Sequence, residues 1–169
     1  MGKRSAFPRH DRDFYRTPAS AVVPLVPHLS GLTFDEPCCG DGALIRHLQS
    51  HGLTCVRASD IAPRQIGIEM DAFDLKFCTG QMFISNPPWS RDILHPLIEH
   101  LSNLAPTWLL FDADWAHTKQ ATPYRTRCSK IVSVGRVRWV EGSQHCGKDN
   151  CAWYLFERGA QSTTFAWRQ

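Results

Sequence analysis

The residues best suited to chemistry are Asn86-Pro87-Pro88-Trp89, which follow the apolar segment 82–84. An apolar segment of this kind is typical of the end of a buried strand. The two prolines fix φ and remove two backbone donors, so the strand has to end at Asn86. The Asn86 amide, the free carbonyl of Pro87 and the Trp89 ring would suit a planar group that carries an NH2, because they offer two acceptors and a stacking surface. The alternative interpretation is a proline-rich turn beside a core tryptophan.

A second candidate is the glycine-containing turn Cys38-Cys39-Gly40-Asp41-Gly42, between a predicted strand at 33–37 and a predicted helix at 43–51. Gly40 and Gly42 allow a sharp turn and close approach of a ligand to the backbone. A strand, a Gly-x-Gly turn and a helix begin a nucleotide-binding βαβ unit. Ile45 and Arg46 stand where a dinucleotide fingerprint would need a third glycine. The turn therefore predicts a nucleoside ligand without a pyrophosphate.

Two acidic residues could complete a nucleoside site. Asp60 ends a second predicted strand, residues 54–59, where a carboxylate can accept hydrogen bonds from a ribose diol. Asp71 follows a short apolar segment and could meet an adenine amino group beside the Phe73 ring. An exposed aspartate at a strand end is also common without any ligand, so Asp60 alone decides nothing.

The elements that must position these residues follow from hydrophobic patterning. Thr17 is predicted to cap a short helix that has Pro18 at its first position. A clear amphipathic helix is predicted at 92–104, and a continuously apolar strand, typical of a parallel sheet, at 108–111. Further strands are predicted at 130–134, 136–140 and 152–157, with the last two forming an antiparallel edge, and 115–128 is predicted to be irregular. Alternating strands and helices predict the α/β class.

Composition fits one globular domain. The 169 residues carry a net charge of +3, and basic residues gather before residue 17 and between Lys119 and Arg138, which suits a polyanion. We expect a flexible basic arm at 1–13 and a single domain at 14–169. Seven cysteines, without a secretory signal or a membrane-spanning run, favour reduced thiols and a cytoplasmic location, with no membrane partner. His145 with Cys146, Cys151 and Cys128 suggests zinc, but the spacing is not standard, so a polar loop is favoured and no metal is predicted.

Glu36-Pro37-Cys38-Cys39-Gly40-Asp41-Gly42 resembles the Asp/Glu-Pro-x-Cys-Gly-x-Gly signature of S-adenosylmethionine-dependent methyltransferases that act on amino groups. Asn86-Pro87-Pro88-Trp89 resembles their Asp/Asn-Pro-Pro-aromatic catalytic motif. Between residues 14 and 157 the chain resembles the small DNA adenine-N6 methyltransferases of phages and prophages. The resemblance implies a Rossmann-like, mostly parallel sheet with an antiparallel edge strand and helices on both faces.

The resemblance also implies S-adenosyl-L-methionine as cofactor. Tyr15, Thr17 and Pro18 would help to cover its methionine part. Glu36 and Gly40 would hold the amino acid portion, Asp60 the ribose, and Asp71 with Phe73 the adenine. The complete implied set is Tyr15, Thr17, Pro18, Glu36, Pro37, Cys38, Gly40, Gly42, Asp60, Ile61, Asp71, Ala72, Phe73 and Asn86.

The expected partner is DNA, double- or single-stranded, and a homodimer stays open. Trp89, Trp115, Arg125, Arg127 and Lys148 are the expected substrate contacts. Trp89 replaces the commoner Tyr or Phe, and only the 14 residues 72–85 separate Asp71 from Asn86, which leaves no room there for a target-recognition domain. We therefore expect low sequence specificity. Methylation of RNA adenine or of protein glutamine, and a non-catalytic methyltransferase-fold partner, remain alternatives.

Overall fold

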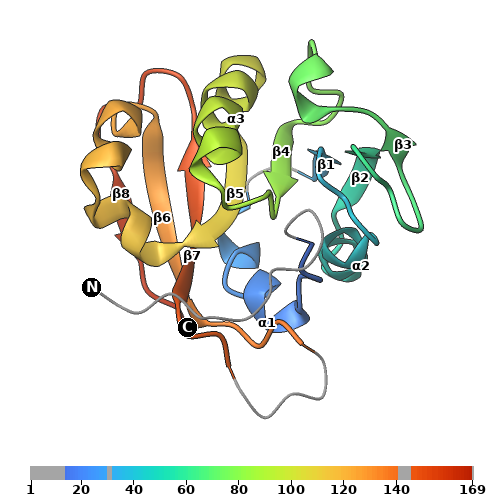
Figure 1. Cartoon of the computed structure of the whole chain (residues 1–169), viewed down its shortest axis with the longest axis horizontal. Helices are drawn as coiled ribbons and strands as arrows, with labels where there is room; N and C mark the ends of the chain where they lie inside the picture. The colour runs from blue at the N-terminus through green and yellow to red at the C-terminus, as the bar shows by residue number, and fades with distance from the viewer. Residues whose placement is uncertain (1–13, 30–31, 141–145, 169) are drawn as a thin grey trace.

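The computed structural model describes residues 14–29, 32–140 and 146–168. Their fold is built on one eight-stranded sheet with the order β3-β2-β1-β4-β5-β7-β6-β8 (Figure 1). The strands are β1 (Thr33–Glu36), β2 (Thr54–Asp60), β3 (Ile68–Glu69), β4 (Met82–Ser85), β5 (Thr107–Asp112), β6 (Cys128–Arg136), β7 (Asn150–Phe156) and β8 (Thr164–Ala166). All neighbouring strands pair in parallel except β7, which runs antiparallel to both β5 and β6.

Helices cover both faces of this sheet, as expected for the α/β class (Figure 1). The α-helices are α1 (Ala19–Val22), α2 (Ala43–Ser50) and α3 (Arg91–Leu104), and the 3-10 helices are η2 (Val26–His28), η3 (Ala72–Asp74), η4 (Ala113–His117) and η5 (Lys119–Tyr124). In one core α1 and α2 pack on the sheet, and in the other α3, η4 and η5 do so. None of the described helices has the length and apolar composition needed to cross a membrane.

Alternation along β7 shows how one strand serves both cores. Trp153 points into the core of α1 and α2, whereas Tyr154 and Phe156 point into the core of α3. Successive side chains of a strand project to opposite faces, so a strand buried on both faces must be apolar throughout. The Trp153 indole also donates a 2.7 Å hydrogen bond to the carbonyl of Ala21, which fastens α1 to the sheet.

Most predicted elements are present with their ends shifted by one or two residues, but the carboxyl-terminal part differs. Residues 136–140 do not form the predicted strand beyond Arg136, and β6 itself pairs with β7. The antiparallel strand is not at the edge, because it lies between β5 and β6. The edge strand on the side of β6 is β8, which the sequence patterning missed, and η4 and η5 lie largely in the segment predicted to be irregular.

Two further predictions concern the amino-terminal part. Pro18, and not Thr17, is the residue before α1, and the helix has no side-chain cap. The helix ends at Val22, as Pro24 requires. The expected basic arm at 1–13 lies outside the described residues, as does His145 of the proposed zinc cluster.

Candidate active site

A pocket opens where β1, β2 and β4 end, at the carboxyl edge of the parallel strands. Eleven of the residues predicted to bind a cofactor line it: Tyr15, Thr17, Glu36, Pro37, Cys38, Gly40, Asp60, Ile61, Asp71, Ala72 and Asn86. Residues outside the predicted cofactor set complete the wall: Phe14, Arg16, Cys39, Asp41, Ala43, Leu44, Ala62, Arg64, Pro88, Ile93 and Leu97. Segments 14–17, 36–44, 60–64 and 71–72 therefore meet in one place.

Three predicted cofactor residues do not line this pocket. Pro18 precedes α1, and Gly42 shapes the start of α2 with φ of 77°, where a Cβ would lie 2.3 Å from the Ile66 side chain. Phe73 is 37% exposed, and its ring lies 5.8 Å from the His100 ring of α3. The Phe73 ring therefore packs against α3 and does not stand beside Asp71 in the pocket wall.

The floor of the pocket is a turn held by Asp60. Its two carboxylate oxygens accept hydrogen bonds of 2.8 Å, one from the Gly40 amide and one from the Ala62 amide. Gly40 has φ of 52°, and a Cβ there would lie 2.6 Å from the Phe14 ring. Only glycine fits such a position, since an L side chain would meet both a strained backbone and a clash. Asp60 thus fixes the turn, and each of its oxygens keeps a lone pair for a ligand.

Glu36 is a buried carboxyl group with one unused oxygen. Its Oε1 accepts hydrogen bonds from the Ser85 hydroxyl at 2.5 Å and from the Cys38 amide at 3.3 Å. Its Oε2 is buried and has no hydrogen-bond partner among the described residues. Burial raises the pKa of Glu36 to about 8, although both hydrogen bonds act in the opposite direction. An unpaired buried oxygen in a pocket wall is a ready acceptor for a cationic donor.

The two cysteines of the turn are not poised for nucleophilic chemistry. Burial is the main cause that raises the pKa of Cys39 to about 12, and it raises the pKa of Cys38 further still. Because the thiolate is the nucleophile, both side chains are unreactive near neutral pH. They act as small packing residues, with the Cys39 thiol donating to the Ile66 carbonyl.

Hydrogen bonds fix the orientation of the Asn86 amide at the end of β4. Its Nδ2 donates to the Thr17 hydroxyl at 3.1 Å and to the Tyr15 carbonyl at 3.3 Å. Its Oδ1 accepts a 3.3 Å hydrogen bond from Trp89 Nε1. An indole nitrogen can only donate, so the atom that faces it has to be the amide oxygen. One lone pair of Oδ1 remains, and Thr17, predicted as a helix cap, instead positions this amide.

An aromatic cluster stands beside Asn86. The Trp139 ring makes edge-on contacts with the Trp89 ring, at a centroid distance of 5.6 Å, and with the Tyr15 ring at 6.1 Å. Trp89 Nε1 also donates to the Leu110 carbonyl at 3.1 Å, which turns the polar edge of the ring inward. Sequence reasoning missed Trp139, because it falls in the segment mistaken for a strand. Its position directly after β6, at the carboxyl edge of the sheet, is the signal that could have identified it.

The segment 14–17 covers the glycine turn. Arg16 Nε forms a 2.8 Å ion pair with Asp41, whose carboxylate also accepts from the Ala43 amide. The Arg64 guanidinium lies 4.1 Å from the Phe14 ring centroid, a cation–π distance. An ion pair and an aromatic contact therefore hold this segment over the pocket floor.

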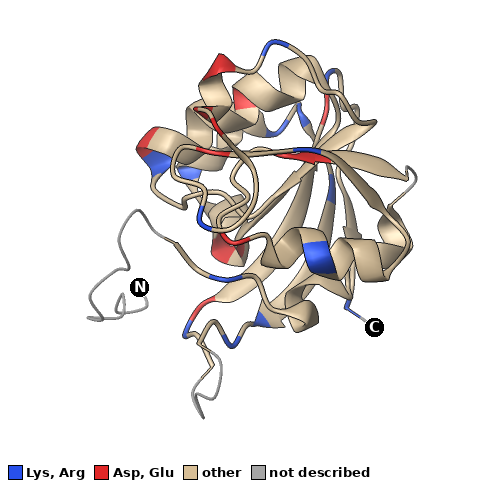
Figure 2. Ribbon diagram, turned by 90° about the vertical axis from the view of Figure 1, so that its right-hand side faces the viewer, with Lys and Arg blue, Asp and Glu red and all other residues tan. Residues whose placement is uncertain are grey.

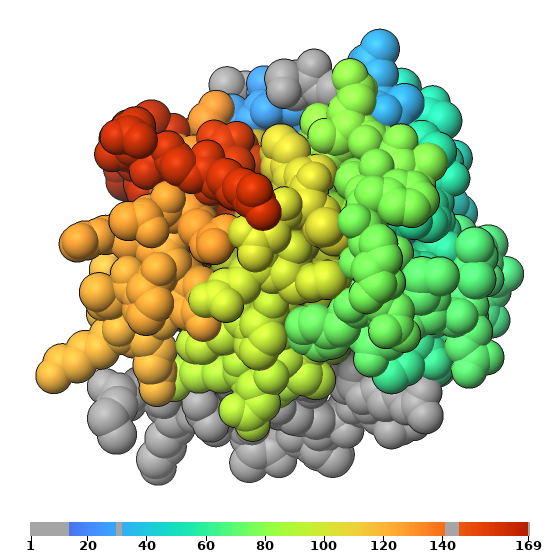
Figure 3. Space-filling view, turned by 90° about the horizontal axis from the view of Figure 1, so that it is seen from above, coloured from blue at the N-terminus to red at the C-terminus, as the bar shows by residue number. Residues whose placement is uncertain are grey.

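The predicted substrate residues are scattered. Trp115 is only 5% exposed and packs among Phe111, Tyr154 and Phe156, so it belongs to the core and not to a substrate surface. Arg127 lies at the opposite end of the sheet, where it donates to Ser102 and Asn103 at the end of α3. Figure 3 looks down on that end, with residues 119–127 in orange beside α3. Lys148 is exposed and precedes β7, at the same edge as Asn86.

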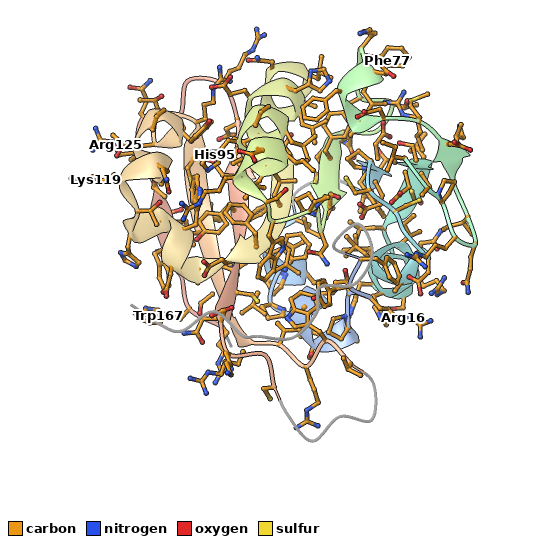
Figure 4. The ribbon with its side chains drawn as sticks, viewed as in Figure 1. Arg16, Phe77, His95, Lys119, Arg125 and Trp167 are labelled. Atoms are coloured by element: carbon orange, nitrogen blue, oxygen red, sulfur yellow. The ribbon has the colours of Figure 1, made fainter. Side chains whose placement is uncertain are left out.

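Arg125 is exposed on the outer side of η5. Figure 4 shows it together with Lys119, on the side of the molecule away from Arg16 and the pocket. No group of three or more His, Cys, Asp or Glu side chains within the described ranges could hold a metal ion. Cys128 and Cys151 are buried, and each thiol has a backbone carbonyl as its partner.

The fold is shared with many solved structures. The 23S rRNA methyltransferase ErmE matches with a TM-score of 0.57 and 13% identity, over 86% of this chain and 70% of that one. The fold is the Rossmann-like methyltransferase fold. A dimethyladenosine transferase from Plasmodium falciparum has a TM-score of 0.55 and 16% identity, over 85% and 62%. The modification subunit of a candidate type I restriction enzyme from Vibrio vulnificus YJ016 has a TM-score of 0.57 and 9% identity, over 91% of this chain and 47% of that one.

No protein-family model matches the chain, and no curated protein matches it in sequence. At the identities above, the likeness to solved methyltransferase structures concerns the fold. The chemistry of the site has to be argued from the residues that line it.

Proposed function

We propose that this protein is an S-adenosylmethionine-dependent methyltransferase that modifies the N6 amino group of adenine in DNA. One observation carries the proposal. Asn86, whose Oδ1 is an oriented acceptor, lines the same pocket as Glu36 and the Asp60 turn, and Glu36 has an unpaired carboxyl oxygen. A site for a cationic amino acid nucleoside thus adjoins a site for a planar NH2 group.

The lining residues fit the cofactor. Oε2 of Glu36 is a buried acceptor, and the α-ammonium group of the cofactor would donate a hydrogen bond to it. The same group would supply the positive charge that stabilises a buried carboxylate. The free lone pairs of Asp60 would accept from ribose hydroxyls. Ile93 and Leu97 of α3 offer an apolar wall near Asp71 and Ala72. S-adenosylmethionine would supply an electrophilic methyl group on its sulfonium.

For methyl transfer, the protein has to make the lone pair of the exocyclic adenine nitrogen available. The exocyclic amine of adenine is a poor nucleophile because its lone pair is delocalised into the ring. Hydrogen bonds from its two hydrogens to Asn86 Oδ1 and to the Pro87 carbonyl favour a pyramidal nitrogen, and they strengthen as positive charge develops on it. In the transfer, the nitrogen lone pair would form the new C–N bond as the C–S bond of the cofactor broke, and the surplus N6 proton would leave to solvent. Because Thr17 and Trp89 hold the amide in place, little reorganisation is needed.

Other chemistries fit less well. Covalent catalysis by cysteine is disfavoured because burial keeps the thiols of Cys38 and Cys39 protonated. The second candidate is methylation of RNA adenine. It is favoured by the fold shared with an rRNA methyltransferase and a dimethyladenosine transferase. DNA is preferred here because the paired motifs at Glu36 and Asn86 resemble those of small DNA methyltransferases.

The deciding experiment incubates the purified protein with labelled cofactor and separate pools of DNA, RNA and protein, followed by mass spectrometry of the products. We expect N6-methyladenine in DNA. Label in RNA adenine or in protein glutamine alone would replace the proposed substrate, and no label in any pool would favour the non-catalytic alternative. Methylation of a random DNA library should show many sequence contexts, and one strict motif of four or more bases would contradict low specificity.

A further inference from the structure

The free edge of the sheet carries two exposed aromatic rings that no contact in the core explains. Phe165 of β8 is 53% exposed, and Trp167, directly after it, is 79% exposed. Their rings meet edge-on at 4.9 Å. Phe165 is in register with Ile131 of β6, whose side chain packs toward α3, so the pair lies on the α3 face of the edge. Exposed rings of this size at a free strand commonly mark an interaction site.

Positive charge surrounds the same corner of the molecule. Arg136 is the last residue of β6 and Arg138 follows it, Lys148 precedes β7, and Arg168 follows Trp167, and all four side chains are exposed. The Arg168 guanidinium lies on the other face of this edge, against Gly135 and near Ser20, Val23 and Pro24 of the α1 region. None of the four forms an ion pair with another described residue, and the acidic residues near them at this edge include Asp149, Asp112 and Asp114. Figure 2 marks the basic and the acidic residues along the ribbon of the described chain.

The corner lies at the same end of the sheet as the candidate active site. β8 runs parallel to β6, so Trp167 stands at the carboxyl edge, as Asn86 does. Figure 4 shows Trp167 at the same end of the molecule as Arg16 of the pocket wall. Four strand intervals separate β4 from β8. At about 4.8 Å per interval the separation is roughly 19 Å. Along one strand of duplex DNA, with a rise of about 3.4 Å per nucleotide, this distance corresponds to five or six steps, and along a more extended single strand to fewer.

We propose that Phe165 and Trp167, with Arg136 and Arg138, bind the nucleic acid strand that extends from the target adenine. This inference rests on the proposed function and adds to it a second contact site outside the catalytic pocket. Stacking of bases on exposed rings beside a basic groove is the usual way to hold single-stranded nucleic acid without reading its sequence. The rings would accept a base splayed from the strand, and the guanidinium groups would contact its phosphates.

The test compares oligonucleotides of two lengths. Fluorescence anisotropy measures the Kd of a short single-stranded DNA, with two nucleotides on each side of one adenine, and of a long one with ten on each side. We expect the long DNA to bind the wild-type protein at least about fivefold more tightly, as one stacked base would give. Phe165→Ala with Trp167→Ala should remove this advantage, while the methylation rate on the short DNA stays unchanged. Phe165→Leu with Trp167→Leu, which keeps apolar area at β8, should remove it as well.

Phe77→Ala is the matched control. Phe77 is 62% exposed and lies at the opposite end of the sheet (Figure 4), so its loss should leave the length advantage intact. Retention of the advantage by the double variants would overturn the inference. The inference would also be overturned if the two rings were needed only for binding to vesicles of anionic phosphatidylserine, which would assign the surface to a membrane. Failure of the proposed function gives a different result, because the wild-type protein would then not methylate the short DNA.

Discussion

At the scale of single residues, Asn86 combines two tasks. Its amide nitrogen is used by Thr17 and Tyr15, which leaves its oxygen to face Trp89 and, in the proposed reaction, the target amine. Asn86→Ala should lower the rate of methyl transfer by about 10²–10³-fold, as loss of one oriented polar group at a reacting centre does. The cofactor Kd should change by no more than a few-fold. Single-turnover kinetics and calorimetry measure the two quantities.

Thr17→Val is the companion variant, because it leaves Asn86 present and removes one of its anchors. It should lower the transfer rate less than Asn86→Ala does. Near-normal turnover of Asn86→Ala would remove Asn86 from the catalytic role.

Glu36 should couple cofactor binding to the uptake and release of protons. Its pKa of about 8 means that it is mostly protonated at pH 7 in the free protein. A cationic amino group near Oε2 favours the ionised form, so binding should release close to one proton at pH 7. Titration calorimetry in two buffers of different ionisation enthalpy measures this release. Equal enthalpies in both buffers, or the same release from Glu36→Gln, would contradict the assignment.

The same carboxyl group should make stability depend on pH. The folded protein holds the Glu36 proton to about pH 8, whereas the unfolded chain loses it near the ordinary value of 4.5. The folded state therefore binds more protons between these values, and the free energy of unfolding should fall as pH rises through this window. Denaturant unfolding at several pH values should show a smaller decline for Glu36→Gln. A decline of equal size in both proteins would mean that other groups cause it.

At the scale of elements, the segment 14–17 should act on how long the cofactor stays bound. The ion pair of Arg16 with Asp41 holds this segment, but the Arg16 side chain is half exposed, and such pairs contribute about 0.2–1 kcal/mol. Arg16→Gln should therefore raise the cofactor dissociation rate by a factor of about five or less. Stopped-flow displacement measures it. Asp41 is not the partner to replace, because it also accepts from the Ala43 amide at the start of α2.

The packing around η4 predicts that Trp115 stabilises the fold. The ring is almost completely buried among Phe111, Tyr154 and Phe156, and its indole donates to His95 at 3.0 Å. Trp115→Ala should lower the free energy of unfolding by about 3–5 kcal/mol. Arg125→Gln, on the exposed side of the neighbouring segment, should change it by less than about 0.5 kcal/mol. Comparable stability of the two variants would contradict the core position of Trp115.

Sequence patterns predicted the parallel half of the sheet well because its signals are local. The apolar run at 108–111, the stripe at 92–104 and the Gly40 turn each fit one element, and the ends of parallel strands meet at one edge. The placement of β7 between β5 and β6 could not be read in this way, since its partners are decided by long-range packing. Trp115 and Phe73 were misassigned for the same reason, because burial depends on which elements pack together. Trp139 was missed because residues 136–140 were predicted to form a strand.

At the scale of the whole molecule, affinity for DNA should come largely from phosphate contacts, which carry no sequence information. If Arg136, Arg138 and Lys148 each neutralise one phosphate, the plot of log K against log salt should have a slope of roughly −2 to −3 on single- or double-stranded DNA. Arg136→Gln with Arg138→Gln should reduce the magnitude of the slope by about 1.5 to 2. Lys76→Gln, at the opposite end of the sheet, should leave it unchanged. A slope near zero would contradict an electrostatic contact surface.

β7 comes late in the sequence but lies inside the sheet, and this affects how the protein folds during its synthesis. β7 lies between β5 and β6, and its side chains Trp153, Tyr154 and Phe156 complete both cores. While the ribosome synthesises residues 1–149, β5 and β6 have no strand between them, and each exposes unpaired backbone groups. Folding of the nascent protein therefore has to wait until residues 150–156 have left the exit tunnel. Until then the open side of β5 is the region where the growing chain is most prone to pair with another molecule.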